Sequence, residues 1–199
     1  MVQTTKNTRK EQAENTRKKL FNAALNVMKE KGYEQTTIRE ICKRANTSLG
    51  SFYTYFKSKD AVLQSYYDDA VQTYATRFQA NTEALTPKEK LLEFYDWYAD
   101  YTTSIGVDFC RIFFSPSNKA LDIDKVYNQI MITTLEFVDQ GFDEHIFNRN
   151  LIKPKALNKD ICIVFKGAVL DWCAEDAAYD LKSYAHHLIA TYLRAVSLN

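Results

Sequence analysis

Glycine and proline are scarce in this sequence, whose 199 residues include 5 Gly and 3 Pro. Because these residues make turns and break helices, their scarcity favours helices joined by short connections over sheets. So few glycines leave hardly any room for a Gly-rich dinucleotide turn or a Walker loop, and the sequence contains no H-E-x-x-H motif and no Ser-His-Asp pattern. We therefore expect an all-α protein that is not an enzyme and carries no cofactor.

Histidine and closely spaced cysteine are lacking as well. Of the 3 His, His186 and His187 are adjacent, so on a helix their side chains would point about 100° apart and could hardly bind one metal ion. The four cysteines stand far apart and form no C-x-x-C pair: Cys42, Cys110, Cys162 and Cys173. This spacing predicts reduced, buried thiols and no metal site.

Long apolar runs are missing too. The first residues, Met1–Lys10, are polar and carry three basic side chains, with no apolar segment behind them. This pattern differs from a secretory signal and from a membrane span. We expect a cytoplasmic protein that makes no contact with membranes.

The formal net charge of +1 hides a difference between the two ends of the chain. Residues 1–60 contain 13 Lys and Arg against 6 Asp and Glu, whereas residues 61–199 contain 13 against 19. A basic N-terminal segment followed by an acidic remainder favours a polyanion as the partner of the N-terminal end. We accordingly predict two domains, residues 1–60 and residues 61–199.

Three helices are predicted in the first segment, at about Glu11–Lys31, Thr37–Ala45 and Leu49–Phe56. The first has apolar residues at helical spacing and stops before Gly32. Thr37 and Glu40 form a capping box at the start of the second. Asn46 tolerates the left-handed backbone of the following turn, and Ser48 can cap the third helix. Two short helices joined by a three-residue turn are typical of a helix-turn-helix.

The rest of the chain adds six predicted helices, which brings the total to about nine. Ser58 caps the first of these, which continues to about Asn81, and the box at Thr86–Glu89 begins the next. The remaining four are expected at about Val107–Phe114, Asp122–Phe142, Asn158–Glu175 and Asp180–Ser197.

The stretch Thr36–Asp60 reads TTIREICKRANTSLGSFYTYFKSKD and resembles the DNA-binding domain of the TetR family of transcriptional regulators. The match covers residues 16–63 without a gap. The departures are mild: Cys42 stands for a usual Ala, Asn46 for a Gly, and Thr47 for a Val of the same shape. The resemblance implies a repressor that binds palindromic double-stranded operator DNA as a homodimer and leaves it when a small molecule binds residues 61–199. An adaptor or activator without a small-molecule effector is the alternative.

The resemblance also implies which residues of the N-terminal domain contact DNA. The helix at Ser48–Phe56 would enter the major groove. Phosphate contacts would come from Thr37, Tyr53, Tyr55 and Lys59, and base contacts from Ser48, Leu49, Ser51 and Thr54. Gly50 would let the helix approach the groove closely. Leu49 either touches a thymine methyl group or packs back on its own domain.

Tight operator binding needs two such domains, so the C-terminal domain is expected to dimerise. Its last two helices carry stripes that a monomer would struggle to cover, and two copies would make a four-helix bundle. The expected interface residues are Phe165, Val169, Leu188, Thr191, Tyr192 and Ala195, with Trp172 at or just behind the seam. The alternative is that these stripes face other helices of the same chain.

Aromatic residues gather on the helix after Thr86 and on its expected neighbours. They predict a pocket for an aromatic or otherwise apolar small molecule: Phe94, Trp97, Tyr98, Tyr101, Phe113, Phe137, Phe165 and Trp172. Glu93, Asp96 and Asp100 share one side of the same helix. They either face the pocket and favour a cationic ligand or form a solvated acidic face.

Overall fold

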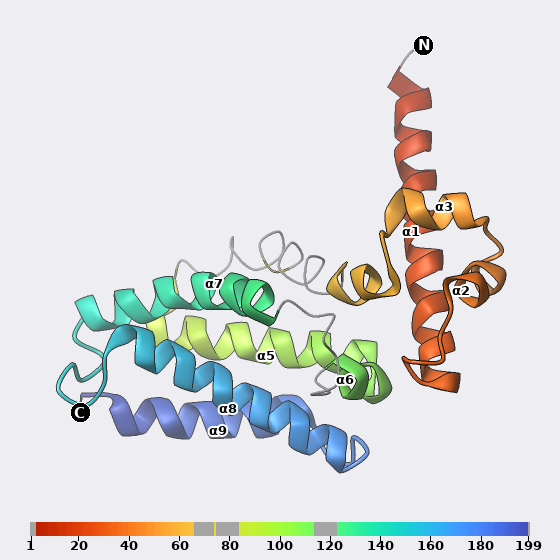
Figure 1. Ribbon diagram of the computed structural model, residues 1–199. Helices are drawn as coiled ribbons and strands as arrows, with labels where there is room; N and C mark the ends of the chain where they lie inside the picture. The colour runs from red at the N-terminus through yellow and green to blue at the C-terminus, as the bar shows by residue number, and fades with distance from the viewer. Residues whose placement is uncertain (1–2, 66–73, 75–83, 114–122, 199) are drawn as a thin grey trace. The chain divides into compact units, whose positions relative to one another are not determined.

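The computed structural model describes residues 3–65, 74, 84–113 and 123–198, and the regular elements among them are helices (Figure 1). The chain divides into two compact units, Met1–Tyr66 and Tyr67–Asn199, which we call the head and the body. The all-α prediction is confirmed for the described residues, which form eight helices and a further helical segment at 59–65. None of these helices is long and apolar enough to cross a membrane.

The head contains α1 (Gln3–Lys31), α2 (Ile38–Ala45), α3 (Leu49–Tyr55) and the segment at 59–65. Each contributes buried apolar side chains, among them Leu20, Ala24, Val27, Met28, Ile41, Phe52, Val62 and Leu63. The segment at 59–65 therefore belongs to the head, whereas the predicted boundary after residue 60 placed most of it in the second domain.

The first helix is longer than predicted. It begins at Gln3, well before the expected start near Glu11. The prediction relied on the spacing of apolar residues, and the beginning of α1 has almost none. Its Lys, Arg and Gln residues are good helix formers, so they extend the helix while Arg9 and Lys10 stay exposed.

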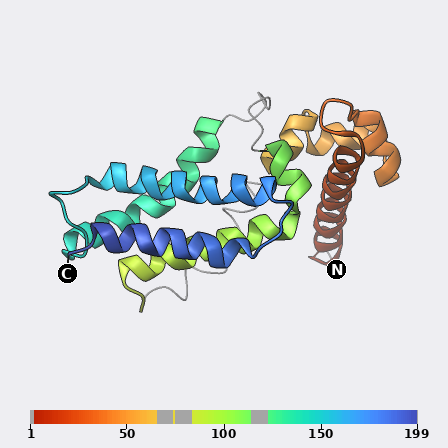
Figure 2. The ribbon, with the colours of Figure 1, turned by 90° about the horizontal axis from the view of Figure 1, so that it is seen from below.

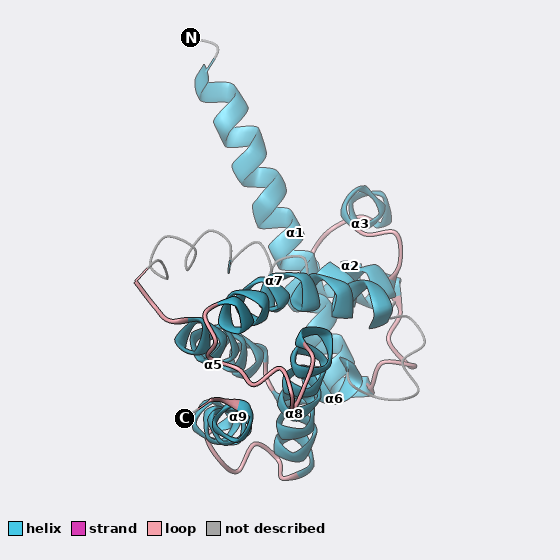
Figure 3. Cartoon of the chain, turned by 90° about the vertical axis from the view of Figure 1, so that its left-hand side faces the viewer, coloured by secondary structure: helices cyan, strands magenta, loops and turns pink. Residues whose placement is uncertain are grey.

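The body contains α5 (Pro87–Ile105), α6 (Val107–Phe113), α7 (Ile123–Asp143), α8 (Pro154–Ala174) and α9 (Leu181–Val196). Its four long helices form a closed ring, in which α5 packs on α9, α9 on α8, α8 on α7 and α7 on α5 (Figure 3). The short α6 packs on α5 and α8. The caps at Thr86 and Asp180 begin α5 and α9 as predicted.

The start of α8 corrects the prediction. The helix begins at Pro154, four residues before the expected start at Asn158, because proline at the first position needs no hydrogen-bond partner for a backbone N–H. Asn158 instead lies fully buried inside the helix. It accepts a hydrogen bond from Thr134 Oγ1 at 2.6 Å and donates to the Met131 carbonyl at 2.8 Å, which ties α8 to α7.

The end of the chain pairs with the connection between α7 and α8. The Asn148 N–H donates to the Val196 carbonyl, and the Leu198 N–H donates to the Ile146 carbonyl, each at 2.9 Å. Phe147 beside them is buried on α7, so close to Gly141 that a Cβ there would lie 2.3 Å from its ring. Glycine at this position thus permits the contact.

Several predicted positions lie outside the described residues. They include most of the helix expected to end near Asn81, as well as Phe114 and Asp122 at the ends of two others. Of the described part, Ser58 Oγ accepts a hydrogen bond from the Ala61 N–H at 3.1 Å, as a cap for 59–65. Tyr74, which is described, is buried.

Candidate nucleic-acid interface

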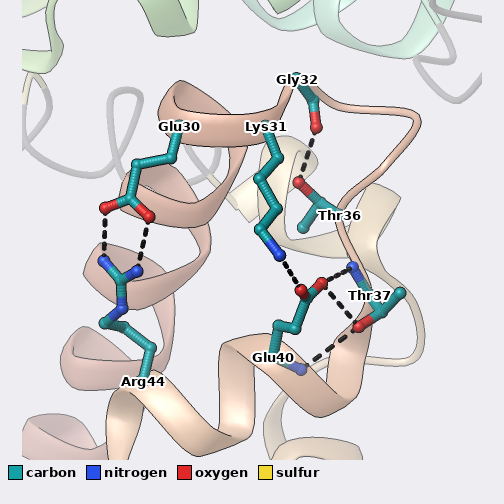
Figure 4. Close-up of polar contacts among 7 residues, drawn as sticks. All are labelled: Glu30, Lys31, Gly32, Thr36, Thr37, Glu40 and Arg44. Atoms are coloured by element: carbon teal, nitrogen blue, oxygen red, sulfur yellow. Dashed lines mark hydrogen bonds and ion pairs between the residues drawn. The ribbon is translucent and has the colours of Figure 1, made fainter.

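The start of α2 is held by the reciprocal cap that the sequence predicts (Figure 4). The Glu40 N–H donates to Thr37 Oγ1 at 3.3 Å, and the Thr37 N–H donates to Glu40 Oε2 at 3.2 Å. Lys31, at the end of α1, pairs with the same carboxylate. The pKa of Glu40 is lowered to about 2, first by the Lys31 hydrogen bond and then by those from Thr37. The beginning of α2 is therefore fixed to the end of α1.

The seam between α1 and α2 holds a second ion pair, which sequence reasoning missed. Arg44 donates to both carboxylate oxygens of Glu30, at 2.7 and 2.6 Å (Figure 4). The two residues are 14 positions apart, so no local pattern indicated the pair. Both side chains are about half exposed, so solvent screens this ion pair and it adds little to stability.

The turn before α3 has the predicted chemistry. Asn46 adopts the left-handed conformation, with φ 52° and ψ 51°, and Ser48 Oγ accepts a hydrogen bond from the Ser51 N–H at 3.1 Å. Phe52 and Phe56 are buried with their ring centroids 5.7 Å apart. These two rings fix which face of α3 points into the head and which face remains outside.

The outward face of α3 carries most of the side chains predicted to reach the bases. Leu49 is 40% exposed, Ser48 and Thr54 are exposed as well, and Ser51 is half-buried. Tyr53, which was predicted to contact phosphate, is 57% exposed on the same helix. Leu49 is therefore partly covered and partly open to a partner. A Cβ at Gly50 would meet only Ser48 Oγ, at 3.8 Å, so the packing of the free head does not require glycine at this position.

The residues predicted to bind phosphate differ in how available they are. Tyr53 and Thr37 are exposed, but the Thr37 hydroxyl already donates to Glu40 at 2.9 Å. Tyr55 is half-buried. Lys59 Nζ donates to the Tyr33 carbonyl at 2.8 Å and lies 4.2 Å from the centre of the Tyr33 ring. An ammonium has three donors, so Lys59 retains donor capacity for a further acceptor.

In the body, five of the eight predicted effector residues form one aromatic cluster. Tyr98 stacks on Phe165 with ring centroids 4.8 Å apart, and Trp97 stacks on Tyr101 at 5.5 Å. Phe94 completes the five. Tyr74 and Tyr95 join the same cluster, the first at 4.7 Å from Phe94 and the second at 5.2 Å from Phe165. The sequence reasoning did not include these two tyrosines.

The other three predicted effector residues have different surroundings. Phe113 stacks on Phe109 within α6, with ring centroids 5.6 Å apart. The Trp172 indole donates to the Tyr179 carbonyl at 3.1 Å, near the end of α8. Phe137 is half-buried on α7.

The acidic side of α5 agrees for the most part with the solvated face that was one of the two alternatives, because Glu93 and Asp100 are exposed. Asp100 pairs with Lys182 at 2.7 Å, and the Asp96 carboxylate lies 3.0 Å from His186 Nδ1. Both contacts join α5 to α9, whereas Glu93 is exposed. The two alternatives considered for this side, a cation-binding wall or a solvated face, both missed these pairs because the partners lie 82 and 90 residues apart.

The predicted dimer residues need correction. The protomer itself buries Phe165 and Val169, and Trp172 is also buried, so none of the three offers surface to a second copy. Leu188 and Tyr192 are half-buried, and Thr191 and Ala195 are exposed. The predicted residues of α8 thus face other helices of the same chain, which was the alternative considered, because a sequence does not distinguish burial within the protomer from burial against a partner.

A partly different stripe lies at the surface of these two helices, and its α9 part includes the predicted Leu188, Thr191 and Ala195. On α8 it consists of Ile163, Gly167, Leu170 and Ala174, and on α9 of Tyr184, Leu188, Thr191 and Ala195. Each set recurs every three or four residues, so each occupies one side of its helix. Because α8 and α9 lie side by side (Figure 2), we name these eight residues together the α8–α9 stripe.

Comparisons with known proteins assign a family to the head and a fold to the chain. Residues 20–66 match the model for bacterial regulatory proteins of the tetR family. The chain is 25% identical over 179 residues to the fatty acid metabolism regulator protein of Bacillus subtilis, covering 85% of this chain and 90% of the relative.

Solved structures agree with that match. The transcriptional regulator FadR from Bacillus subtilis, in complex with stearoyl-CoA, superposes with a TM-score of 0.77 at 19% identity, covering 89% of this chain and 98% of FadR. A putative TetR-family transcriptional regulator from Syntrophomonas wolfei also gives 0.77, at 16% identity over 92% of this chain and 94% of its own.

Proposed function

We propose that the chain is a regulator of the TetR family, and that it is a repressor that binds palindromic operator DNA as a homodimer. A small, largely apolar molecule bound in the body would release it. The outward face of α3 is the observation that carries the proposal. Buried Phe52 and Phe56 hold this short helix in the head, and the opposite face leaves Leu49 and Tyr53 open to a partner.

Leu49 supports direct contact with bases in particular. The exposed leucine side chain forms no hydrogen bonds with water, whereas in the major groove it can contact a thymine methyl group. Gly50 next to it adds no bulk, so the backbone of α3 can approach the groove. The excess of basic residues among residues 1–60 would supply the salt-dependent, sequence-independent part of binding.

Selection of DNA from a random duplex pool, followed by titration of the enriched site at several salt concentrations, tests this proposal. We expect a palindromic site and an affinity that falls steeply with salt. Tyr53→Ala should weaken binding to all duplexes alike, and Leu49→Ala should change preference at one base step. Asn26→Ala, at an exposed polar position of α1, is the control. No enrichment, or equal affinity for selected and scrambled duplexes, would refute specific DNA binding.

The α8–α9 stripe supports dimerisation through the body. Two such stripes packed together would bury the exposed Ile163 and Leu170 in a four-helix bundle. Ile163→Glu would place a charge in that seam and should yield monomers in sedimentation. Ile132→Glu is a matched control, because Ile132 is an exposed isoleucine on α7. If both variants remain dimers, the seam lies elsewhere.

The aromatic cluster on α5 supports an apolar effector. Its rings come from α5, α8 and Tyr74, so a ligand lying against them would contact several elements of the body at once. Asp96 and Asp100 have cationic or imidazole partners on α9, which removes the argument for a cationic ligand. FadR from Bacillus subtilis was crystallised with stearoyl-CoA, so acyl-CoA thioesters are the first ligands to test.

Release of a fluorescent operator by acyl-CoA thioesters, free fatty acids and neutral aromatic compounds tests the effector. An effector must bind the DNA-free conformation more tightly than the DNA-bound one. Trp97→Ala should lower its potency, whereas Glu93→Gln, at an exposed position of the same helix, should leave it unchanged. If no compound in these classes releases DNA or raises the melting temperature, the apolar effector is refuted.

A further inference from the structure

A row of exposed side chains follows α8 at every fourth residue. Residues four positions apart form a ridge on the surface of a helix. We name this row the α8 ridge, and its members, all exposed, are Lys155, Lys159, Ile163, Gly167, Asp171 and Glu175. The first two members are cationic, the middle two are uncharged and the last two are anionic.

Gly167, near the middle of the ridge, is not explained by packing within the protomer. A Cβ at this position would meet nothing within 4 Å. Glycine is a poor residue for the interior of a helix, and its usual benefit is that another backbone can approach closely. Because Gly167 is exposed, a backbone that uses this space must come from outside the protomer.

The charges of the ridge do not stabilise α8 itself. Acidic residues favour the first turn of a helix and basic residues the last, yet α8 has neither, with Lys155 in its first turn and Asp171 in its last. Lys159 forms no ion pair with another described residue. Asp171 accepts a hydrogen bond from the Tyr179 hydroxyl at 2.9 Å, and a carboxylate can accept several more. Both ends of the ridge thus remain available to charges on a partner.

We propose that α8 of one subunit packs antiparallel on α8 of a second copy, ridge beside ridge, with the two-fold axis at the level of Phe165. This inference rests on the dimer proposed above and adds its orientation and register. The ridge is symmetric about its midpoint, so Lys159 would lie beside Asp171 of the partner subunit, and Ile163 beside Gly167 of the partner subunit. Two-fold symmetry makes each contact twice.

Size and charge both favour this orientation. Ridges of residues four apart pack side by side in the commonest class of helix contact, and Ile163 is large where the partner's Gly167 is small. A parallel arrangement would instead place Lys159 against Lys159 and Asp171 against Asp171 of the partner subunit. Opposite charges fix the register of an interface, whereas like charges suppress the wrong pairing.

Cross-linking of the full-length protein tests the orientation. Lys159→Cys and Asp171→Cys are purified separately, mixed until subunits exchange, and treated with a short bismaleimide. We expect a cross-linked dimer from the mixture and little from either variant alone. The wild type gives the background, because its four cysteines are buried.

A charge exchange tests the register. Asp171→Lys should raise the dissociation constant of the dimer about ten-fold or more in sedimentation, because two attractive pairs become repulsive. Lys159→Glu added to this variant should restore most of the affinity. Asp139→Lys is the matched control, because Asp139 is an exposed aspartate on α7.

The space at Gly167 is tested by Gly167→Leu, which should separate the subunits while circular dichroism shows folded monomers. A wild type that sediments as a monomer would contradict the proposed dimer itself. If the wild type is a dimer but each cysteine variant links only to itself, or neither links in the mixture, the antiparallel α8 contact is overturned and dimerisation stands. The same holds if Asp171→Lys or Gly167→Leu dimerises as tightly as Asp139→Lys.

Discussion

The head and the body are both built from helices, but contacts of different range hold them. In the head, caps at Thr37 and Ser48 form between residues three positions apart. In the body, α5 is joined to α9 by pairs whose members lie 82 and 90 residues apart. Local caps therefore set where the two short helices of the head begin, whereas the pairs that join α5 to α9 form only when distant helices of the body meet.

This difference fits the roles proposed above for the two units. A recognition helix must present one fixed face to DNA, and a short, capped helix anchored by two aromatic rings achieves this. A ligand-binding unit instead presents mostly apolar and aromatic side chains to its ligand, and in the body such rings come from several helices. We therefore expect that a single substitution in the head changes either the stability of the head or its affinity for DNA.

The largest effect is expected from Phe52→Ala in the head. Phe52 is fully buried, and loss of a buried phenylalanine side chain costs about 3–5 kcal/mol. Hydrogen exchange should lose protection in α1, α2 and α3, while α5, α8 and α9 remain protected. Tyr53→Ala, one residue on but exposed, should keep that protection and lose only affinity for DNA. Equal loss in head and body would mean that the two units do not unfold separately.

A smaller loss is expected from Asn158→Ala in the body. Asn158 joins α7 to α8 through Thr134 and the Met131 carbonyl, and loss of a buried hydrogen bond costs about 0.5–1.5 kcal/mol, since the Thr134 hydroxyl keeps the Ile130 carbonyl as an acceptor. Urea denaturation of this variant, of Thr134→Val and of the double variant gives the coupling between the two side chains. If the two losses simply add, the Thr134–Asn158 hydrogen bond does not stabilise the body.

The head could be predicted closely because each of its signals lies within a few residues of its partner. The capping box of Thr37, the left-handed Asn46 and the Ser48 cap all occur where the sequence places them. The predicted start of α1 was wrong because helix propensity alone extends that helix to Gln3, in a segment that has no apolar residues at helical spacing. The ion pair of Glu30 with Arg44 was missed for lack of any local pattern.

The helices of the body could be predicted from the sequence, but which of their faces are buried and which are exposed could not. Buried and exposed apolar stripes look alike in a sequence, so Phe165 was assigned to a dimer seam, whereas it stacks on Tyr98 inside the protomer. Ile163 and Leu170, seven positions apart on α8, were the available signal for the exposed stripe. The acidic side of α5 could not be interpreted without knowing that α9 lies beside it.

Gly50→Ala is expected to have a still smaller effect on stability. The variant should be slightly more stable than the wild type but should bind DNA more weakly. Alanine is favoured over glycine in a helix by up to about 1 kcal/mol, and the added Cβ meets only Ser48 Oγ, at 3.8 Å. The head should therefore become slightly more stable in urea denaturation, while affinity for the selected operator falls. Unchanged affinity would show that α3 does not approach DNA at this residue.

The smallest effect is a pH dependence carried by Glu40. Its pKa is lowered from 4.5 to about 2 in the folded head, first by the Lys31 hydrogen bond and then by Thr37. A carboxyl group whose pKa is lower when folded stabilises the folded state above its unfolded pKa, and this contribution is lost as the pH falls towards the folded value. Glu40→Gln retains an amide oxygen that can accept from the Thr37 N–H, so chiefly the charge is removed.

The wild type should therefore be more stable than Glu40→Gln above pH 4.5, and the difference should shrink as the pH falls from 4.5 towards 2. Urea denaturation followed by hydrogen exchange of α2 measures this difference at each pH. Glu34→Gln is the control, because it removes an exposed carboxylate from the same head and so changes the net charge equally. If both variants show the same pH dependence, net charge rather than the Lys31–Glu40 contact is responsible, and the end of α1 does not fix the beginning of α2 through this carboxylate.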